Sequence, residues 1–271
     1  MIAPFIPPVA LTIAGSDSGG GAGIQADLRT FSFHQVHGTS ALTCVTAQNT
    51  TGVSRVDALP PAAVIAQIKA VTSDMSVRAV KTGMLLNQAI IEAVAAHLDR
   101  YPIANLVVDP VMVSRMGAKL IDQGAIAALK SQLLPLATIL TPNRYEAQIL
   151  ADMEITSLAD MQTAAQKILA LGPKAVIVKG GGFSGDLLGV DVWCEGGQDE
   201  VLRTQPVETT NTHGTGCTLS SAIAANLAKE MSSLAAAKAA KGYVTGALQH
   251  ALSIGKGQGP VGHFYPLLTV S

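Results

Sequence analysis

The chain has 271 residues, of which 48% are hydrophobic and 14% are charged, so it can bury a large core. A formal net charge of −1, without any run of Lys and Arg, argues against a nucleic-acid or anionic-membrane partner. The three cysteines, Cys44, Cys194 and Cys217, form neither a disulfide framework nor a zinc-type spacing, and no segment resembles a signal peptide or a membrane span. We therefore expect a cytoplasmic protein that acts on small molecules.

Short apolar segments alternate with Ala-rich, helix-like segments along most of the chain. The apolar segments are residues 9–14, 41–47, 79–81, 105–109, 138–140 and 175–179. Because they are apolar throughout, they predict strands of a parallel sheet that is covered by helices on both faces. Pro60-Pro61 opens one predicted helix and Thr141-Pro142-Asn143 opens another. The fold class is therefore α/β, and the absence of a linker favours one domain.

The last third of the chain departs from this rhythm. Residues 186–204 predict a β-hairpin that turns at 195–199. Two helices, at 214–229 and 233–251, are followed by a Gly-rich tail at 255–262. The first of these helices begins within the most informative motif in the chain.

That motif is the segment 211–220, Asn-Thr-His-Gly-Thr-Gly-Cys-Thr-Leu-Ser. Gly214 and Gly216 lack a Cβ, so their backbone can approach a ligand, and the N–H groups at the start of the helix point at the same space. Cys217 lies on the first turn, where we expect the helix-end potential to lower its thiol pKa so that it acts as a base. The alternative, from these residues alone, is a helix cap followed by a buried cysteine.

Polar residues end each predicted strand. They are Asp17, Gln48 and Asn49, Lys81 and Thr82, Asp109, Asn143, and Lys179. Each alone is an ordinary turn or surface residue, but ligands collect at the carboxyl ends of parallel strands, so the series predicts a site there. Asp109 and Glu146 offer the oxygens that Mg²⁺ takes, and Lys179 could place a charge on a transferring phosphate. The combination predicts ATP chemistry.

A second Gly-rich segment, residues 16–27, contains a loose G-x-G-x-x-A after a strand and raises the alternative of a nicotinamide-binding turn. That turn needs an acidic residue about 20 positions further on. No Asp or Glu lies between Asp27 and Asp57, which weakens this alternative. A Walker A motif does not occur either, so the phosphate site is of another type.

With these motifs the chain resembles the ribokinase-like superfamily and, within it, the hydroxymethylpyrimidine and phosphohydroxymethylpyrimidine kinases of thiamine biosynthesis. The resemblance is carried by residues 14–27, 46–50, 81–85, 108–112, 141–147, 178–181 and 213–217. It implies a single kinase domain over residues 1–271, built as a three-layer αβα sandwich with a mostly parallel central sheet and a small hairpin near 186–204.

The resemblance also implies an activity, namely the ATP- and Mg²⁺-dependent phosphorylation of 4-amino-5-hydroxymethyl-2-methylpyrimidine and then of its monophosphate. Cys217 would be the catalytic base, in a position where most of the superfamily has Asp. The implied substrate pocket comprises Gln48, which would bind the pyrimidine edge, together with Gly15, Asp27, Met84 and Val111. The implied ATP and phosphate contacts are Lys179, Asn143, Gly214, Thr215 and Gly216, and the implied metal ligands are Asp109 and Glu146.

Other functions stay open. A pyridoxine or pyridoxal kinase, as the main or a side activity, is the nearest, although related pyridoxal-type kinases tend to have Met where this chain has Gln48. A catalytically silent vitamin-binding or regulatory protein is disfavoured by intact Asp109, Glu146, Lys179 and Cys217. The resemblance further implies a homodimer, and a requirement for a monovalent cation is a further open point.

Overall fold

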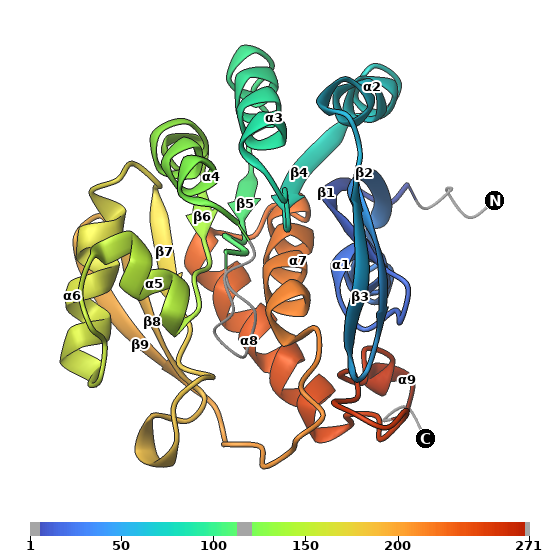
Figure 1. The fold of residues 1–271 in the computed structure, drawn as a ribbon. Coiled ribbons are helices and arrows are strands. Elements are labelled where there is room, and N and C mark those ends of the chain that lie inside the picture. The colour runs from blue at the N-terminus through green and yellow to red at the C-terminus, as the bar shows by residue number, and fades with distance from the viewer. Residues whose placement is uncertain (1–5, 113–120, 269–271) are drawn as a thin grey trace.

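The computed structural model describes residues 6–112 and 121–268, and within them nine strands form one sheet (Figure 1). In spatial order they are β3 (Gly52–Ala58), β2 (His37–Asn49), β1 (Val9–Asp17), β4 (Val77–Thr82), β5 (Leu106–Val108), β6 (Ile139–Leu140), β7 (Ala175–Val178), β8 (Val190–Glu195) and β9 (Gln198–Arg203). The six strands from β2 to β7 are parallel, whereas β3 pairs antiparallel with β2 and β8 pairs antiparallel with both β7 and β9.

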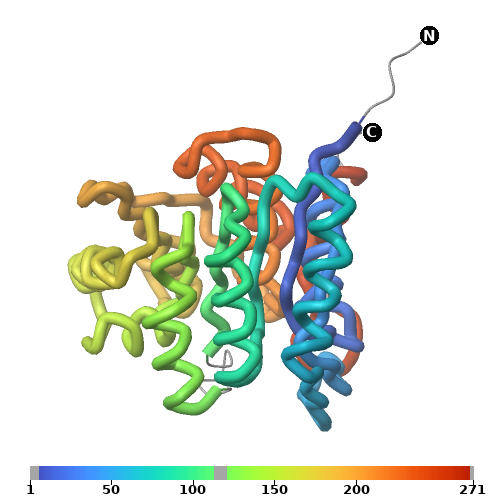
Figure 2. Tube along the Cα trace, turned by 90° about the horizontal axis from the view of Figure 1, so that it is seen from above, coloured from blue at the N-terminus to red at the C-terminus, as the bar shows by residue number. Residues whose placement is uncertain are grey.

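Helices cover both faces of the sheet. The first face carries α2 (Pro61–Thr72), α3 (Gln88–Arg100), α4 (Gln123–Ala128), η1 (Leu129–Leu133), η2 (Leu134–Leu136), α5 (Arg144–Ala151) and α6 (Leu158–Leu169). The second face carries α1 (Gly23–Phe33), α7 (Thr215–Ala228) and α8 (Ser233–Gln249), while η3 (Gly185–Leu187) and α9 (Tyr265–Leu268) are short. Figure 2 shows α2, α3 and α4 side by side along the first face. No helix in the described part of the chain has the length and apolar character needed to cross a membrane.

The core lies in two layers, one on each side of the sheet. Successive strand residues point to opposite faces, so Leu11 and Ile13 pack among the helices of the first face and Ala10 packs among those of the second. All three are fully buried, and truncation of Ile13 to Ala would cost roughly 2–5 kcal/mol of stability. The predicted three-layer αβα sandwich is therefore confirmed.

The predicted elements are present. All six predicted strands lie within or overlap observed ones, and the hairpin is formed by β8 and β9. Pro61 occupies the first turn of α2, and Asn143 caps α5 through a reciprocal capping box with Glu146. Strand β3 was not predicted, because its side chains are all exposed and its sequence has no apolar pattern.

Candidate active site

The carboxyl ends of the parallel strands bring the predicted polar residues to one edge of the sheet. The N–H of Asp109 donates to the carbonyl of Thr82 (3.0 Å), which joins the ends of β4 and β5. The N–H of Lys179 donates to the carbonyl of Pro142 (2.9 Å), and Asn143 and Lys179 form a parallel bridge. Thr82, Asp109, Asn143 and Lys179 therefore lie at the carboxyl ends of the successive strands β4, β5, β6 and β7, as the sequence predicts.

The start of α7 faces this edge. Gly214 has φ +82°, and a Cβ there would lie 1.8 Å from the carbonyl oxygen of Gly21, so only glycine fits. The Thr215 hydroxyl donates to the Thr212 carbonyl (2.6 Å) and closes the preceding turn. At Gly216 a Cβ would lie 3.3 Å from Lys179 Nζ and 3.7 Å from Asp109 Oδ2. The helix N-terminus therefore opens onto the Lys179–Asp109 pair, a geometry that suits an anion.

Lys179 and Asp109 form a largely buried ion pair with Nζ 3.1 Å from Oδ1. Asp109 also accepts weak hydrogen bonds from the hydroxyls of Thr141 and Ser220, both at 3.3 Å. Burial lowers the pKa of Lys179, but the neighbouring carboxylates of Asp109 and Glu146 outweigh burial and raise the pKa above its ordinary value. Lys179 is therefore a fixed positive charge beside the start of α7.

Glu146 fits the predicted metal site. One carboxylate oxygen accepts the N–H of Asn143 (2.7 Å), while the Asn143 side chain accepts the N–H of Glu146 (3.0 Å). Burial and the nearby charge of Asp109 raise the pKa of Glu146, against the opposing effect of Lys179. The two carboxylates repel each other, and a divalent cation bound between them would remove this repulsion. Among the described residues no group of three or more His, Cys, Asp or Glu side chains is arranged to hold a metal ion, and water and phosphate would complete the shell of a Mg²⁺ ion held by Asp109 and Glu146.

Cys217 lies half-buried on the first turn of α7, and the backbone N–H of Gly23 hydrogen-bonds to its sulfur. Burial raises the pKa of the thiol to about 11, although the ammonium of Lys81 opposes this shift. The carboxylates of Asp27 and Asp109 contribute to this rise. The prediction of a lowered thiol pKa is therefore wrong, because burial and two acids outweigh the potential of the helix end. At neutral pH Cys217 is a protonated thiol.

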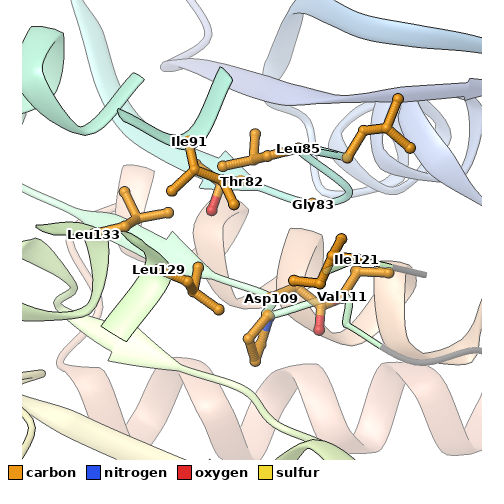
Figure 3. A pocket seen from close by; sticks show the side chains of 11 residues that line it. Thr82, Gly83, Leu85, Ile91, Asp109, Val111, Ile121, Leu129 and Leu133 are labelled. Atoms are coloured by element: carbon orange, nitrogen blue, oxygen red, sulfur yellow. The ribbon is translucent and has the colours of Figure 1, made fainter. Parts of the chain in front are cut away.

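Four of the five predicted substrate residues lie near the carboxyl ends of strands, with Gly15 on β1, Gln48 on β2, Met84 after β4 and Val111 after β5. A Cβ at Gly15 would lie 2.6 Å from Cys44 Sγ and 3.0 Å from Met84 Cε, so glycine lets these two side chains pack close to the backbone of β1. Val111 lines a pocket together with Thr82, Gly83 and Asp109 at the ends of β4 and β5 (Figure 3). The side-chain amide of Gln48 lies 3.4 Å from His213 Nε2.

Asp27 is the exception. Its side chain is fully buried and accepts hydrogen bonds from Thr12, Lys81 and Ser221. In this structure three protein donors occupy the Asp27 carboxylate, and the predicted substrate contact stays a prediction. The sequence spacing placed Asp27 near the site, but the side of α1 on which it lies required the structure.

An Asp–His pair beside Gln48 was missed at the sequence level. Asp17 accepts a hydrogen bond from His213 Nε2 (2.8 Å) and from the N–H groups of Gly19, Gly21 and Ala22. Burial raises the pKa of Asp17, but the hydrogen bonds from His213 and Ala22 bring it below its ordinary value. The pair fastens the glycine-rich loop after β1 to the segment before α7. The position of Asp17 before a glycine-rich segment indicated a functional residue, but nothing in the sequence indicated that His213 would be its partner.

Comparisons with known proteins show the family of this chain. The family model described as phosphomethylpyrimidine kinase matches residues 17–262. The hydroxymethylpyrimidine/phosphomethylpyrimidine kinase of Synechococcus elongatus is 64% identical over 96% of this chain and 98% of its own, and that of Streptomyces coelicolor is 46% identical over 97% of each. Among solved structures, an ADP complex of Bacillus subtilis pyridoxal kinase has a TM-score of 0.88 at 39% identity, covering 97% of this chain and 100% of that one. Phosphomethylpyrimidine kinase from Clostridium difficile has a TM-score of 0.79 at 42% identity, covering 88% and 98%. The chain therefore belongs to the phosphomethylpyrimidine kinase family and has a ribokinase-like fold.

Proposed function

We propose that this kinase transfers a phosphoryl group from ATP to the hydroxymethyl group of 4-amino-5-hydroxymethyl-2-methylpyrimidine, and then a second one to the resulting monophosphate, in thiamine biosynthesis. One observation carries the proposal. The segment 213–217 touches both ends of the site, with His213 beside Gln48 and Gly216 beside Lys179 and Asp109. A base on the same segment, Cys217, would therefore lie between a pyrimidine and a phosphate.

The phosphate end suits ATP. The solved pyridoxal kinase of Staphylococcus aureus in complex with AMP-PCP and pyridoxal is similar to this chain, with a TM-score of 0.86 at 34% identity over 96% of this chain and 94% of that one. Here the N–H groups at the start of α7 and the ammonium of Lys179 would stabilise charge on the transferring phosphoryl group. Asn143 bridges to Lys179 and Thr215 precedes Gly216, so both would border the same phosphate. Mg²⁺, held by Asp109 and Glu146, would neutralise phosphate charge.

The two phosphorylations make different demands on Cys217. The substrate alcohol must lose its proton when it attacks, so a thiolate at Cys217 would accept that proton. A phosphate monoester, with a second pKa near 6, is already ionised at neutral pH and needs no base. Because the pKa of Cys217 is about 11, the rate of the first step should rise with pH above neutrality.

The test is step-resolved kinetics with Cys217→Ala. We expect the alcohol step to fall by roughly 10²- to 10⁴-fold and the monophosphate step to fall far less. Cys194→Ala, which changes a buried thiol on β8, is the matched control and should keep both steps. An equal loss in both steps would show that Cys217 positions the substrate and is not the base.

A second candidate activity is favoured by the comparisons. Two of the structural relatives are pyridoxal kinases, so pyridoxine should be offered in parallel with the pyrimidine and its monophosphate. Products identified by mass separate the alternatives. Turnover of pyridoxine without turnover of the pyrimidine would replace the thiamine assignment with one in vitamin B6 salvage.

We also propose that the enzyme is a cytoplasmic homodimer. Val45, Val53 and Val56 are 45%, 51% and 44% exposed on β2 and on β3, the strand at the edge of the sheet. Burying this edge against a second copy would remove unpaired backbone groups from water. Sedimentation equilibrium of the purified protein measures the mass directly.

A further inference from the structure

A buried ion pair lies between the end of β4 and the helices α1 and α7. Lys81 Nζ is 2.9 Å and 3.0 Å from the two carboxylate oxygens of Asp27, and both side chains are fully buried. The carboxylate also accepts the hydroxyls of Thr12 (2.6 Å) and Ser221 (2.5 Å). Removing two charges from water commonly costs more free energy than their attraction returns. Stability alone therefore does not explain why the chain buries this pair.

The pair is positioned by the two helices that hold Cys217. Gly23 and Asp27 are one turn apart on α1, and Cys217 and Ser221 are one turn apart on α7. The N–H of Gly23 hydrogen-bonds to the Cys217 sulfur, and Ser221 donates to Asp27 one turn further along. The helices are therefore matched turn by turn, with the sulfur and the buried pair on the same interface.

Lys81 reaches this interface from the sheet. Along β4, Ala79 packs in the layer of α1 and α7, whereas Val80 packs in the opposite layer. The alternation of side chains places Lys81 on the same side as Ala79. The Lys81 ammonium therefore extends from the sheet toward the interface of α1 and α7, where it contacts Asp27.

Three charged groups act on the Cys217 sulfur, and each comes from a different part of the fold. Lys81 on β4 lowers the thiol pKa, and Asp27 on α1 and Asp109 after β5 raise it, with Lys81 exerting the largest influence of the three. Burial lowers the pKa of Lys81 itself, but Asp27, Cys217 and Asp109 raise it above its ordinary value, so its ammonium stays charged.

We propose that Lys81 is a positioning residue for the phosphoryl transfer, whose ammonium supplies the positive charge beside which the Cys217 thiolate forms, and that Asp27 limits how much of this charge the sulfur experiences. The proposal rests on the proposed role of Cys217 as the base. In that role the thiol first loses its proton to solvent, and the thiolate then accepts the proton of the substrate hydroxyl. The hydroxyl oxygen bonds to the γ-phosphorus of ATP as the bond to the β-phosphate oxygen breaks, and ADP leaves with that electron pair.

The decisive experiment measures the ionisation of Cys217 without substrate. The rate at which iodoacetamide alkylates Cys217, followed by mass spectrometry of its peptide, is recorded against pH for the wild type and for Lys81→Met, Asp27→Asn and the double variant. We expect the apparent thiol pKa to increase in the order Asp27→Asn, wild type, double variant, Lys81→Met. Each single variant should change the alkylation rate at a fixed pH on the order of tenfold, in opposite directions.

A purely structural role gives a different result. Loosening the helix interface would shift both single variants in the same direction, and that outcome, or an unchanged profile in all variants, overturns the proposal. The double variant retains no lone buried charge, so it tests the proposal even if a single variant does not fold. It loses both influences, of which Lys81 is the larger, and should be alkylated more slowly than the wild type.

A second buried pair provides the matched control. Lys241 Nζ lies 2.6 Å from Asp191 Oδ2, and both side chains are less than 10% exposed. Lys241→Met should disturb stability in the same manner as Lys81→Met but leave the alkylation profile of Cys217 unchanged. Because alkylation requires no pyrimidine, a failure of the substrate assignment would not affect this readout, so the two failures can be distinguished. If the substrate assignment holds, Lys81→Met should also slow the alcohol step more than the monophosphate step.

Discussion

Gly216→Ala should leave the fold intact and remove the activity. Gly216 lies in the first turn of α7, and replacement of a helical glycine by alanine is favourable by up to about 1 kcal/mol. The added Cβ would lie 3.3 Å from Lys179 Nζ, the flexible end of a long side chain that can yield by a few tenths of an ångström. We therefore expect the free energy of unfolding to stay level or to rise by up to about 1 kcal/mol.

The same methyl group stands where the phosphoryl group must lie. It would enter the space between the start of α7 and the Lys179–Asp109 pair, with Asp109 Oδ2 only 3.7 Å away. Displacing the phosphoryl oxygens from the helix N–H groups should resemble the loss of an oxyanion donor, which typically costs about 10²- to 10³-fold in kcat. Both phosphorylation steps should suffer alike, because both transfer a phosphoryl group from the same place.

Urea unfolding and ADP release measure the two effects separately. Gly242→Ala is the matched control, since Gly242 is exposed within α8 and no described atom lies within 4 Å of an added Cβ. It should gain similar stability and keep full activity. Gly214→Ala should instead destabilise the protein, because its Cβ would clash with the Gly21 carbonyl. A fully active Gly216→Ala enzyme would refute the placement of the phosphoryl group beside Lys179.

Three further outcomes are expected. His263 is buried and hydrogen-bonded through Nε2 to the Thr218 hydroxyl, and burial lowers its pKa from 6.5 to about 4. The unfolded chain therefore binds a proton first, and stability is lost as pH falls through this interval. The loss should approach about 3 kcal/mol in urea unfolding near pH 4, and His263→Gln, which keeps a donor, should not show this component. Gln48→Met should raise the ratio of pyridoxine to pyrimidine turnover by roughly 5- to 150-fold, and an unchanged ratio in competition assays would remove Gln48 from substrate selection. Cys217→Asp should retain part of the alcohol step and lose most of the monophosphate step, the reverse of Cys217→Ala, as product analysis by mass will show.

Much of the site follows from regular geometry and could therefore be predicted from the sequence. Parallel strands end at one edge, so Asp109, Asn143 and Lys179 had to lie near one another once the strands were identified. The start of α5 was predictable for a similar reason, because the Asn143–Glu146 capping box is a local pattern of two residues three positions apart.

The contacts that were not predicted join residues far apart in the chain. His213 and Asp17 are 196 positions apart, and Lys81 and Asp27 are 54 apart. No local periodicity encodes such pairs, because each depends on how two elements pack. The thiol pKa of Cys217 could not be predicted for the same reason. The direction of its shift is set by burial and by charges from other elements, and not by the place of Cys217 on the helix.

The raised thiol pKa is consistent with an enzyme that serves two substrates of different charge. The alcohol substrate carries no phosphate, whereas the second substrate is a phosphate monoester that is largely dianionic at neutral pH. A carboxylate at position 217 would be ionised beside Asp27 and Asp109 and would repel that second substrate. A thiol that is neutral at rest imposes no such repulsion, and it becomes a base only when it loses its proton beside Lys81. The high pKa therefore sacrifices some rate in the first step and leaves the same pocket open to the anionic substrate of the second.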